Sequence, residues 1–168
     1  MWRFDRFGDA PALLDEHGQS LTYAQLAREG EALCGAIGGR CLCFGLCGNT
    51  IGSAVGYAGM VEGGVVPALL AASIDRELFA ALYEAYHPAY LWAPGGFEWE
   101  ACESVYERFG YRLLKTPFGT ETKLHDDLAL LLTTSGSTGS PKFVRQSYAN
   151  IRANTESIVE YLALTAQE

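Results

Sequence analysis

Hydrophobic positions along the chain fall into short continuous apolar runs that alternate with longer segments of helical periodicity. The apolar runs predict strands at residues 41–47, 65–70, 90–92, 111–114, 128–133 and 143–146. Apolar residues three or four positions apart predict helices from Thr22 to about Ile37, from Asn49 or Thr50 onward, from Asp75 onward, over 98–109, and from Tyr148 to about Leu162. Continuous apolar strands are typical of sheets buried on both faces. The pattern therefore predicts an α/β fold, a largely parallel sheet flanked by helices on both faces.

The first predicted helix has clear signals at both ends. Thr22 followed three residues later by Gln25 forms the pattern of a capping box, and Leu21 with Leu26 stands at the positions of a hydrophobic staple. Glycines at Gly38 and the next position end the helix. These signals place a helix directly before the first long apolar run.

Two later helices carry patterns that predict how they pack. The helix after position 50 contains Gly52, Gly56 and Gly59, so its backbone can approach a neighbour closely. The helix that Asp75 opens has three apolar residues on one predicted face: Leu78, Leu82 and Tyr86.

The apolar run 128–133 ends at a loop rich in hydroxyl groups and glycine. The loop residues are Thr134, Ser135, Gly136, Ser137, Thr138 and Gly139, followed by a Ser-Pro pair and Lys142. Glycine allows backbone N–H groups to turn toward a ligand, the hydroxyls donate hydrogen bonds, and the lysine adds positive charge. In a Walker P-loop glycine and lysine are adjacent, which they are not here. The pattern therefore predicts a phosphate-binding loop of another kind.

Residues 134–142 resemble the signature loop of the adenylate-forming superfamily, which comprises acyl-CoA synthetases, peptide-synthetase adenylation domains and luciferases. Residues 12–15 and 20–26 resemble the opening of such enzymes, and residues 61–67 resemble their helix-to-strand passage into a second nucleotide-binding layer. The resemblance covers nearly the whole chain. It departs at Phe143 and Tyr148, where the family usually has glycine and histidine.

The resemblance implies that residues 1–168 are the N-terminal portion of the large domain of an acyl-CoA synthetase/luciferase-like fold, since motifs of the rest of that domain and of the C-terminal domain have no counterpart here. It further implies activation of a carboxylic acid with ATP to an acyl-adenylate, release of pyrophosphate, and transfer of the acyl group to CoA or a carrier-protein pantetheine. Thr134, Ser135, Gly136, Ser137, Thr138 and Gly139 would line the β- and γ-phosphates. Lys142 would pair with them as the catalytic cation. Mg²⁺ would be required but held mainly outside these residues, and we expect the isolated 168-residue chain to be inactive.

Charge and hydropathy narrow the class of partner. The formal net charge is -8 and the pI is about 4.9, which disfavours nucleic acid and anionic membranes as partners. A single nucleotide is still acceptable, because Lys142, Arg145 and Arg152 gather positive charge near the loop. No apolar run has the length of a signal peptide or a membrane span, so we expect a cytoplasmic protein.

Cysteine and histidine residues could suggest a metal site, but their spacing along the sequence disfavours one. Cys41, Cys43 and Cys47 lack the paired C-x-x-C arrangement of structural zinc, and we interpret them as buried strand thiols. His125 and the two aspartates after it are adjacent in sequence and cannot converge on one ion, so we interpret them as solvated turn residues. We therefore predict no metal ligands here.

Other interpretations of the sequence also bear on function. The loop could be a plain flexible connection, and the chain could be a truncated, non-catalytic nucleotide-binding or interaction module with the same fold. A Rossmann or flavodoxin-like domain would need a Gly-x-Gly-x-x-Gly turn after the first parallel strand, which is missing. A chain that leaves strands and helix faces uncovered would also be expected to self-associate.

Overall fold

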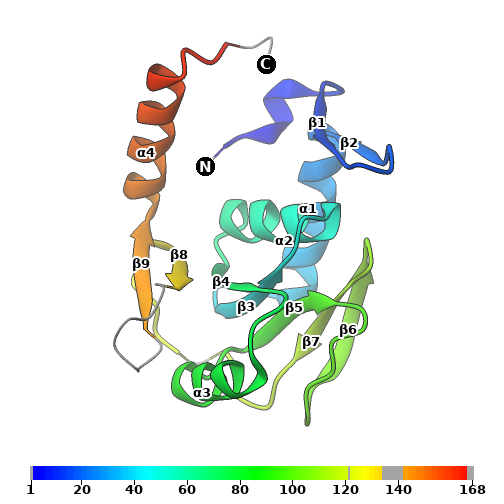
Figure 1. The fold of residues 1–168 in the computed structure, drawn as a ribbon, viewed down its shortest axis with the longest axis vertical. Helices are drawn as coiled ribbons and strands as arrows, with labels where there is room; N and C mark the ends of the chain where they lie inside the picture. Colours follow the sequence, from blue (N-terminus) through cyan, green and yellow to red (C-terminus); the bar gives the residue numbers. More distant parts are fainter. Residues whose placement is uncertain (1, 121, 134–141, 166–168) are drawn as a thin grey trace.

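The computed structural model describes residues 2–120, 122–133 and 142–165 (Figure 1). The helices are the 3₁₀ helix η1 (Phe4–Phe7) and the α-helices α1 (Tyr23–Ile37), α2 (Ile51–Glu62), α3 (Arg76–Tyr86) and α4 (Tyr148–Tyr161). The strands are β1 (Pro11–Leu14), β2 (Ser20–Thr22), β3 (Leu42–Cys47), β4 (Val66–Ala71), β5 (Tyr90–Pro94), β6 (Glu103–Arg108), β7 (Tyr111–Lys115), β8 (Leu128–Thr133) and β9 (Phe143–Ser147).

Seven strands form the main sheet in the order β6-β7-β5-β3-β4-β8-β9. The centre, β5-β3-β4-β8, is parallel, and β7, β6 and β9 add antiparallel strands at the two edges. The predicted α/β class and its parallel centre are confirmed. Because β4 and β5 lie on opposite sides of β3, the connections through α2 and α3 pass over opposite faces of the sheet.

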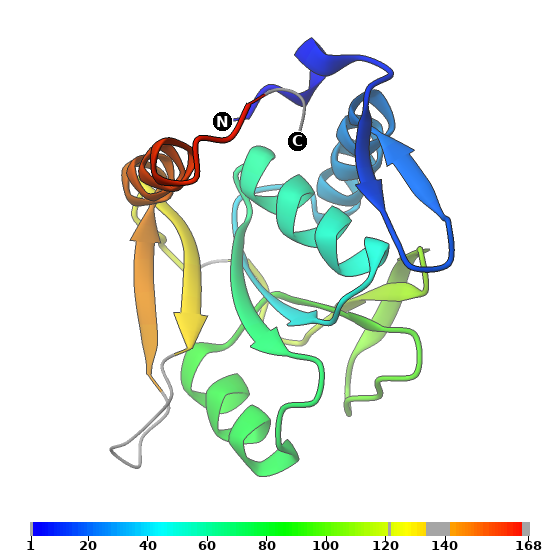
Figure 2. The same cartoon turned by 45° about the horizontal axis from the view of Figure 1, so that its top comes forward.

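Helices cover both faces of the sheet centre (Figures 1 and 2). Helices α1 and α2 lie on one face and α3 lies on the other. Strand β3 contributes to both cores: Phe44 and Leu46 pack with Phe79 of α3, while Cys43 packs with Met60 of α2. Burial on both faces is the reason that β3 reads as a continuous apolar run.

Glycines of α2 bring it close to its neighbours, as the sequence predicted. A Cβ on Gly59 would lie 2.6 Å from the Cα of Gly30 in α1, and a Cβ on Gly56 would lie 2.2 Å from ring atoms of Trp92. The Trp92 Nε1–H donates a hydrogen bond of 2.9 Å to the carbonyl of Gly52. Helix α2 therefore rests on α1 and β5 through its backbone.

The predicted helix over 98–109 is wrong. Residues 103–108 form β6, which pairs antiparallel with β7 at the edge of the sheet. Phe109 and Gly110 connect the strands with φ of 51° and 71°, the two positive values that a tight type I′ hairpin requires. Charged residues on an edge strand imitate the wet face of an amphipathic helix, and a phenylalanine is an uncommon residue in such a turn.

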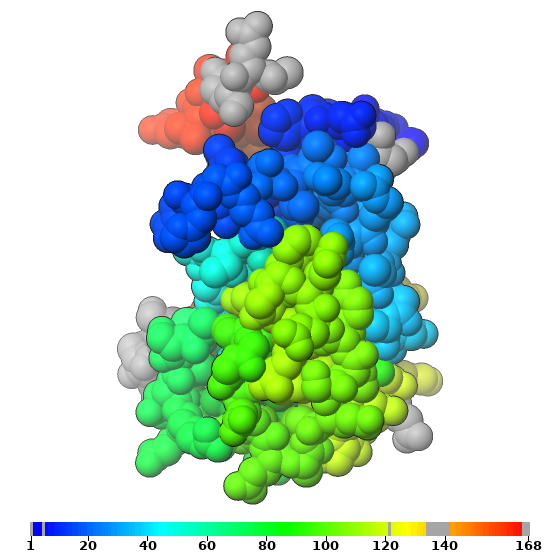
Figure 3. Space-filling view, turned by 90° about the vertical axis from the view of Figure 1, so that its right-hand side faces the viewer, coloured from blue at the N-terminus to red at the C-terminus, as the bar shows by residue number. Residues whose placement is uncertain are grey.

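Two other details depart from expectation. Leu78 is 40% exposed, whereas Leu82 is buried and Tyr86 packs against the core; Phe79 and Tyr83 complete the buried face of α3 in place of Leu78. An N-terminal hairpin, β1–β2, was not expected from the sequence. Figure 3 shows this hairpin and the β6–β7 hairpin on the same side of the molecule, the side away from α4.

Candidate functional site

The predicted phosphate loop connects β8 to β9. Six of its predicted ligand residues, Thr134, Ser135, Gly136, Ser137, Thr138 and Gly139, lie outside the described residues. The residues on both sides are described: Thr133 ends β8 and pairs with Phe143, the first residue of β9. Because β8 is parallel to β4, the loop leaves the sheet at the carboxyl ends of the parallel strands, where ligands of α/β sheets bind.

Lys142 is an exposed residue directly before β9. Arg145 follows on the same strand and is also exposed. Both cations are thus accessible to an anionic ligand near the loop. Exposure leaves the lysine side chain its full rotational freedom, which suits a cation that follows a moving phosphate.

Arg40 fixes the other end of β8, a role that no sequence pattern indicated. Its guanidinium donates hydrogen bonds to the carbonyls of Gly64, His125 and Leu128, each at 2.7 Å. These bonds tie the turn before β4 to the first residues of β8. A lone arginine between a glycine and a buried strand carries no motif, so only the tertiary contacts identify it.

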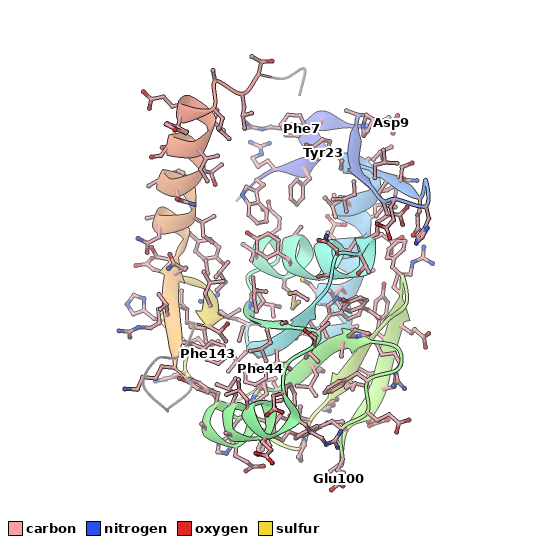
Figure 4. The ribbon with its side chains drawn as sticks, viewed as in Figure 1. Phe7, Asp9, Tyr23, Phe44, Glu100 and Phe143 are labelled. Atoms are coloured by element: carbon pink, nitrogen blue, oxygen red, sulfur yellow. The ribbon has the colours of Figure 1, made fainter. Side chains whose placement is uncertain are left out.

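Phe143, the bulky residue after the lysine, is half-buried and packs inward. Its ring centroid lies 4.7 Å from that of Tyr86 and 5.8 Å from that of Phe44 (Figure 4). Its backbone N–H donates a 3.4 Å hydrogen bond to the Tyr86 hydroxyl. The departure from glycine is therefore accommodated by the core on the α3 face, and it anchors the strand that leaves the loop.

Tyr148, the second departure, stands at the start of α4. Its hydroxyl donates a 3.4 Å hydrogen bond to the carbonyl of Val61, near the end of α2. This bond joins the first turn of α4 to the helix layer above β4. Ser147 caps the same helix in a capping box with Asn150.

A groove of about 800 Å³ opens between α2 and α4 on the face opposite α3. Apolar residues of β4 and β8, namely Leu69, Leu130 and Leu132, line it from the sheet. Its other lining residues are Cys47, Gly48, Asn49, Thr50, Ser53, Ala54, Tyr57, Gln146, Asn150, Ile151, Asn154 and Thr155. Thr50 caps α2 by accepting a 3.3 Å hydrogen bond from the Ser53 N–H.

The three cysteines of residues 41–47, in and directly before β3, are neutral thiols at ordinary pH. Burial raises the pKa of Cys47 above its usual value, and it raises the pKa of Cys41 to about 11. For the fully buried Cys43, burial likewise raises the pKa well above its usual value. Cys41 and Cys43 are buried core residues, as the sequence predicted, whereas Cys47 is half-buried and lines the groove; none is a ready nucleophile.

The described side chains that could ligate Mg²⁺ or Zn²⁺ are dispersed. Among the described residues, no group of three His, Cys, Asp or Glu side chains converges on one point. His125 and the neighbouring Asp127 are both exposed, with a 3.9 Å separation between His125 Nδ1 and the carboxylate. The described residues thus do not by themselves fit a magnesium site.

Among the described residues, no helix is long and apolar enough to cross a membrane.

Comparison with known proteins by sequence gives no match. No protein-family profile matches the chain, and no curated protein matches it.

Comparison of structures gives many matches. O-succinylbenzoate CoA synthetase from Bacillus subtilis, in complex with its acyl-adenylate intermediate, matches with a TM-score of 0.75 and 21% identity over 99% of this chain. The chain has the fold of the adenylate-forming enzymes. A malonyl-CoA ligase matches with a TM-score of 0.66 and 28% identity over 90% of this chain, and a fatty acyl-adenylate ligase from L. pneumophila with 0.67 and 18% over 92%.

The adenylate-forming fold is present here in part. The chain spans 46%, 32% and 30% of the lengths of these three proteins, respectively. The predicted resemblance is therefore confirmed at the level of fold.

Proposed function

We propose that these residues form the N-terminal part of an AMP-forming ligase that activates a carboxylic acid. One observation carries the proposal: a loop with the sequence of a phosphate cradle stands between β8 and β9, in a chain with the adenylate-forming fold. Support also comes from a structurally similar enzyme, O-succinylbenzoate CoA synthetase from Bacillus subtilis, whose structure was solved in complex with ATP and magnesium ion.

The chemistry explains why such a loop is needed. A carboxylate is a poor electrophile, so its oxygen first attacks the α-phosphorus of ATP, the bond to the β-phosphate oxygen breaks, and pyrophosphate leaves. A thiol, from CoA or a pantetheine arm, then attacks the acyl carbonyl and AMP departs with the carboxyl oxygen. The negative charge that develops on the departing pyrophosphate must be stabilised, and this requires hydrogen-bond donors and a cation that are already positioned around it.

The residues of this chain have separate parts in that step. The hydroxyls and backbone N–H groups of residues 134–139 hold the β- and γ-phosphates, and Lys142 neutralises the charge that develops on them. Arg40 and Phe143 keep the two strands in place on either side of the loop. Magnesium, when bound with ATP, would offset phosphate charge, and it would be held mainly by residues other than these.

The test is ATP–pyrophosphate exchange by the complete polypeptide that carries these residues, with its carboxylic acid. Lys142→Ala is expected to lower exchange by about a hundredfold, the scale of losing one preorganised charge contact in a transition state. The matched control is Lys123→Ala, since Lys123 is an exposed lysine before the amino end of β8. Exchange that is unchanged in Lys142→Ala would refute the role of the lysine.

The alternative is a non-catalytic nucleotide-binding or interaction module. This alternative is compatible with a chain that spans 46% of the structure it matches. A fluorescent ATP analogue titrated into the 168-residue chain measures binding without catalysis. The module would be favoured if Lys142→Ala weakens binding of the analogue while the complete protein shows no ATP–pyrophosphate exchange with any acid. Binding together with exchange supports the ligase.

A further inference from the structure

The residue directly after Lys142 is held by one side chain of α3. Tyr86 is the last residue of that helix, and its hydroxyl accepts the 3.4 Å hydrogen bond from the backbone N–H of Phe143. Its ring also packs edge to face against the Phe143 ring, with 72° between the two planes. Tyr86 thus contacts both the backbone and the side chain of the residue that follows the lysine.

The Phe143 ring also contacts the core of the fold. It meets the ring of Phe44 in β3 at 65°, and the Phe44 ring lies 6.0 Å from that of Phe79 in α3 at 81°. Both Phe44 and Phe79 are buried. Edge-to-face pairs at such separations are favourable arrangements of aromatic rings. A row of aromatic rings therefore connects the start of β9 to the buried centre of the sheet (Figure 4).

The helix end that carries Tyr86 is itself fixed. The N–H of His87, which caps the helix, donates a 3.0 Å hydrogen bond to the carbonyl of Tyr83. The carbonyl of the next residue, Pro88, accepts a 2.6 Å hydrogen bond from the buried hydroxyl of Thr116. Because the chain is held directly after Tyr86, the tyrosine hydroxyl has a defined position beside β9.

The position of Lys142 depends on its neighbours in the chain. The lysine is exposed and precedes Phe143, the first residue of β9, which pairs with Thr133 at the end of β8. A cation stabilises a transition state best when it is already in place, and a displacement of about 1 Å can cost about a hundredfold in rate. A contact that fixes Phe143 therefore restricts where the backbone of the lysine lies.

We propose that Tyr86 is a positioning residue for the release of pyrophosphate. Its hydroxyl holds the backbone of Phe143 and thereby keeps Lys142 directed at the phosphates. The proposal rests on the proposed function, in which the lysine neutralises charge on the β- and γ-phosphates. Tyr86 acts through the lysine and not on the substrate, so its hydroxyl contributes to the reaction only while the lysine is present.

The experiment is a double-mutant cycle in the complete polypeptide, measured by ATP–pyrophosphate exchange at saturating ATP and acid. Tyr86→Phe removes one hydroxyl and keeps the ring, so the hydrogen bond is lost while the packing against Phe143 remains. We expect exchange to fall about fivefold, the scale of one lost hydrogen bond. In the Lys142→Ala background the same substitution should change exchange by less than about twofold, because the group that it positions is gone.

The matched control is Tyr83→Phe, one turn earlier in α3. Tyr83 is buried, and its hydroxyl lies 3.8 Å from the sulfur of Cys102, directly before the edge strand β6. This variant removes a hydroxyl from the same helix far from β9 in the strand order, so it should change exchange by less than about twofold. Thermal unfolding followed by circular dichroism verifies that each variant is folded, and a purely structural role of Tyr86 would lower the melting temperature without lowering exchange by the folded protein.

Two results overturn the proposal and leave the proposed function standing. One is unchanged exchange in Tyr86→Phe when Lys142→Ala lowers it. The other is an equal effect of Tyr86→Phe with and without the lysine. If Lys142→Ala exchanges as fast as the wild type, the role of the lysine fails and this proposal fails with it.

A polypeptide that shows no exchange with any acid would refute the ligase but still test the tyrosine. The same cycle is then measured by the dissociation constant of a fluorescent ATP analogue. Coupling between Tyr86→Phe and Lys142→Ala supports positioning of the lysine, whereas additive effects overturn it.

Discussion

The contact between α1 and α2 leads to the sharpest stability prediction. At Gly59 an added Cβ would lie 2.6 Å from the Cα of Gly30 and 3.5 Å from its carbonyl carbon and oxygen. These are backbone atoms of a packed helix, so they cannot rotate away as a flexible side chain would. Gly59→Ala must therefore push the two helices apart.

The expected magnitude follows from two opposing effects. Overpacking of a core contact costs about 1–3 kcal/mol, and the change from glycine to alanine in a helix returns roughly 1 kcal/mol. Because the clash is with backbone, we expect the upper part of the range and a net loss of about 2 kcal/mol in the free energy of unfolding. For a chain of this size the melting temperature should fall by about 4–8 °C.

Gly35 offers a matched control on α1. A Cβ there would meet nothing within 4 Å, so Gly35→Ala should stabilise the protein by roughly 0.5 kcal/mol. Urea unfolding followed by circular dichroism compares the two variants. If Gly59→Ala proves as stable as the wild type, or if both variants change stability in the same direction, the close helix contact is not what holds this layer together.

Two further predictions concern Arg40 and the buried thiols. Arg40→Met removes charge-assisted bonds to four carbonyls and should lower the free energy of unfolding by about 2–3 kcal/mol in urea melts. Arg28→Met, at an exposed position of α1, should change the free energy of unfolding by less than about 0.5 kcal/mol, and similar losses in the two variants would argue against the Arg40 contacts. Burial raises the pKa of Cys34 and of Cys41 from 9.0 to about 11. The unfolded chain therefore releases these protons first, and stability should decline as pH rises from 9 to 11; Cys41→Val should reduce that decline, and an unchanged pH dependence would contradict the assignment.

The sequence alone determined the centre of the fold, because its signals there are local. Three kinds of local pattern carried these predictions: the capping box at Thr22, the apolar runs of β3 and β8, and the glycines of α2. Each pattern is formed by residues that are close together in the sequence. The loop before Lys142 was predicted to bind phosphate from consecutive residues as well, and that prediction falls outside the described residues. The capping box and the two strands were predicted with boundaries within about two residues of the structure.

Only the tertiary structure decided the features that depend on residues distant in sequence. The edge strand β6 became a strand through its pairing with β7, although its charges suit a helix equally well. The face that α3 buries was set by the position of Phe44 beneath it, and Arg40 acquired its role from carbonyls more than 20 residues away. Local propensity chooses among conformations by fractions of a kilocalorie, whereas burial against a particular neighbour outweighs it, and that neighbour is specified by the fold as a whole.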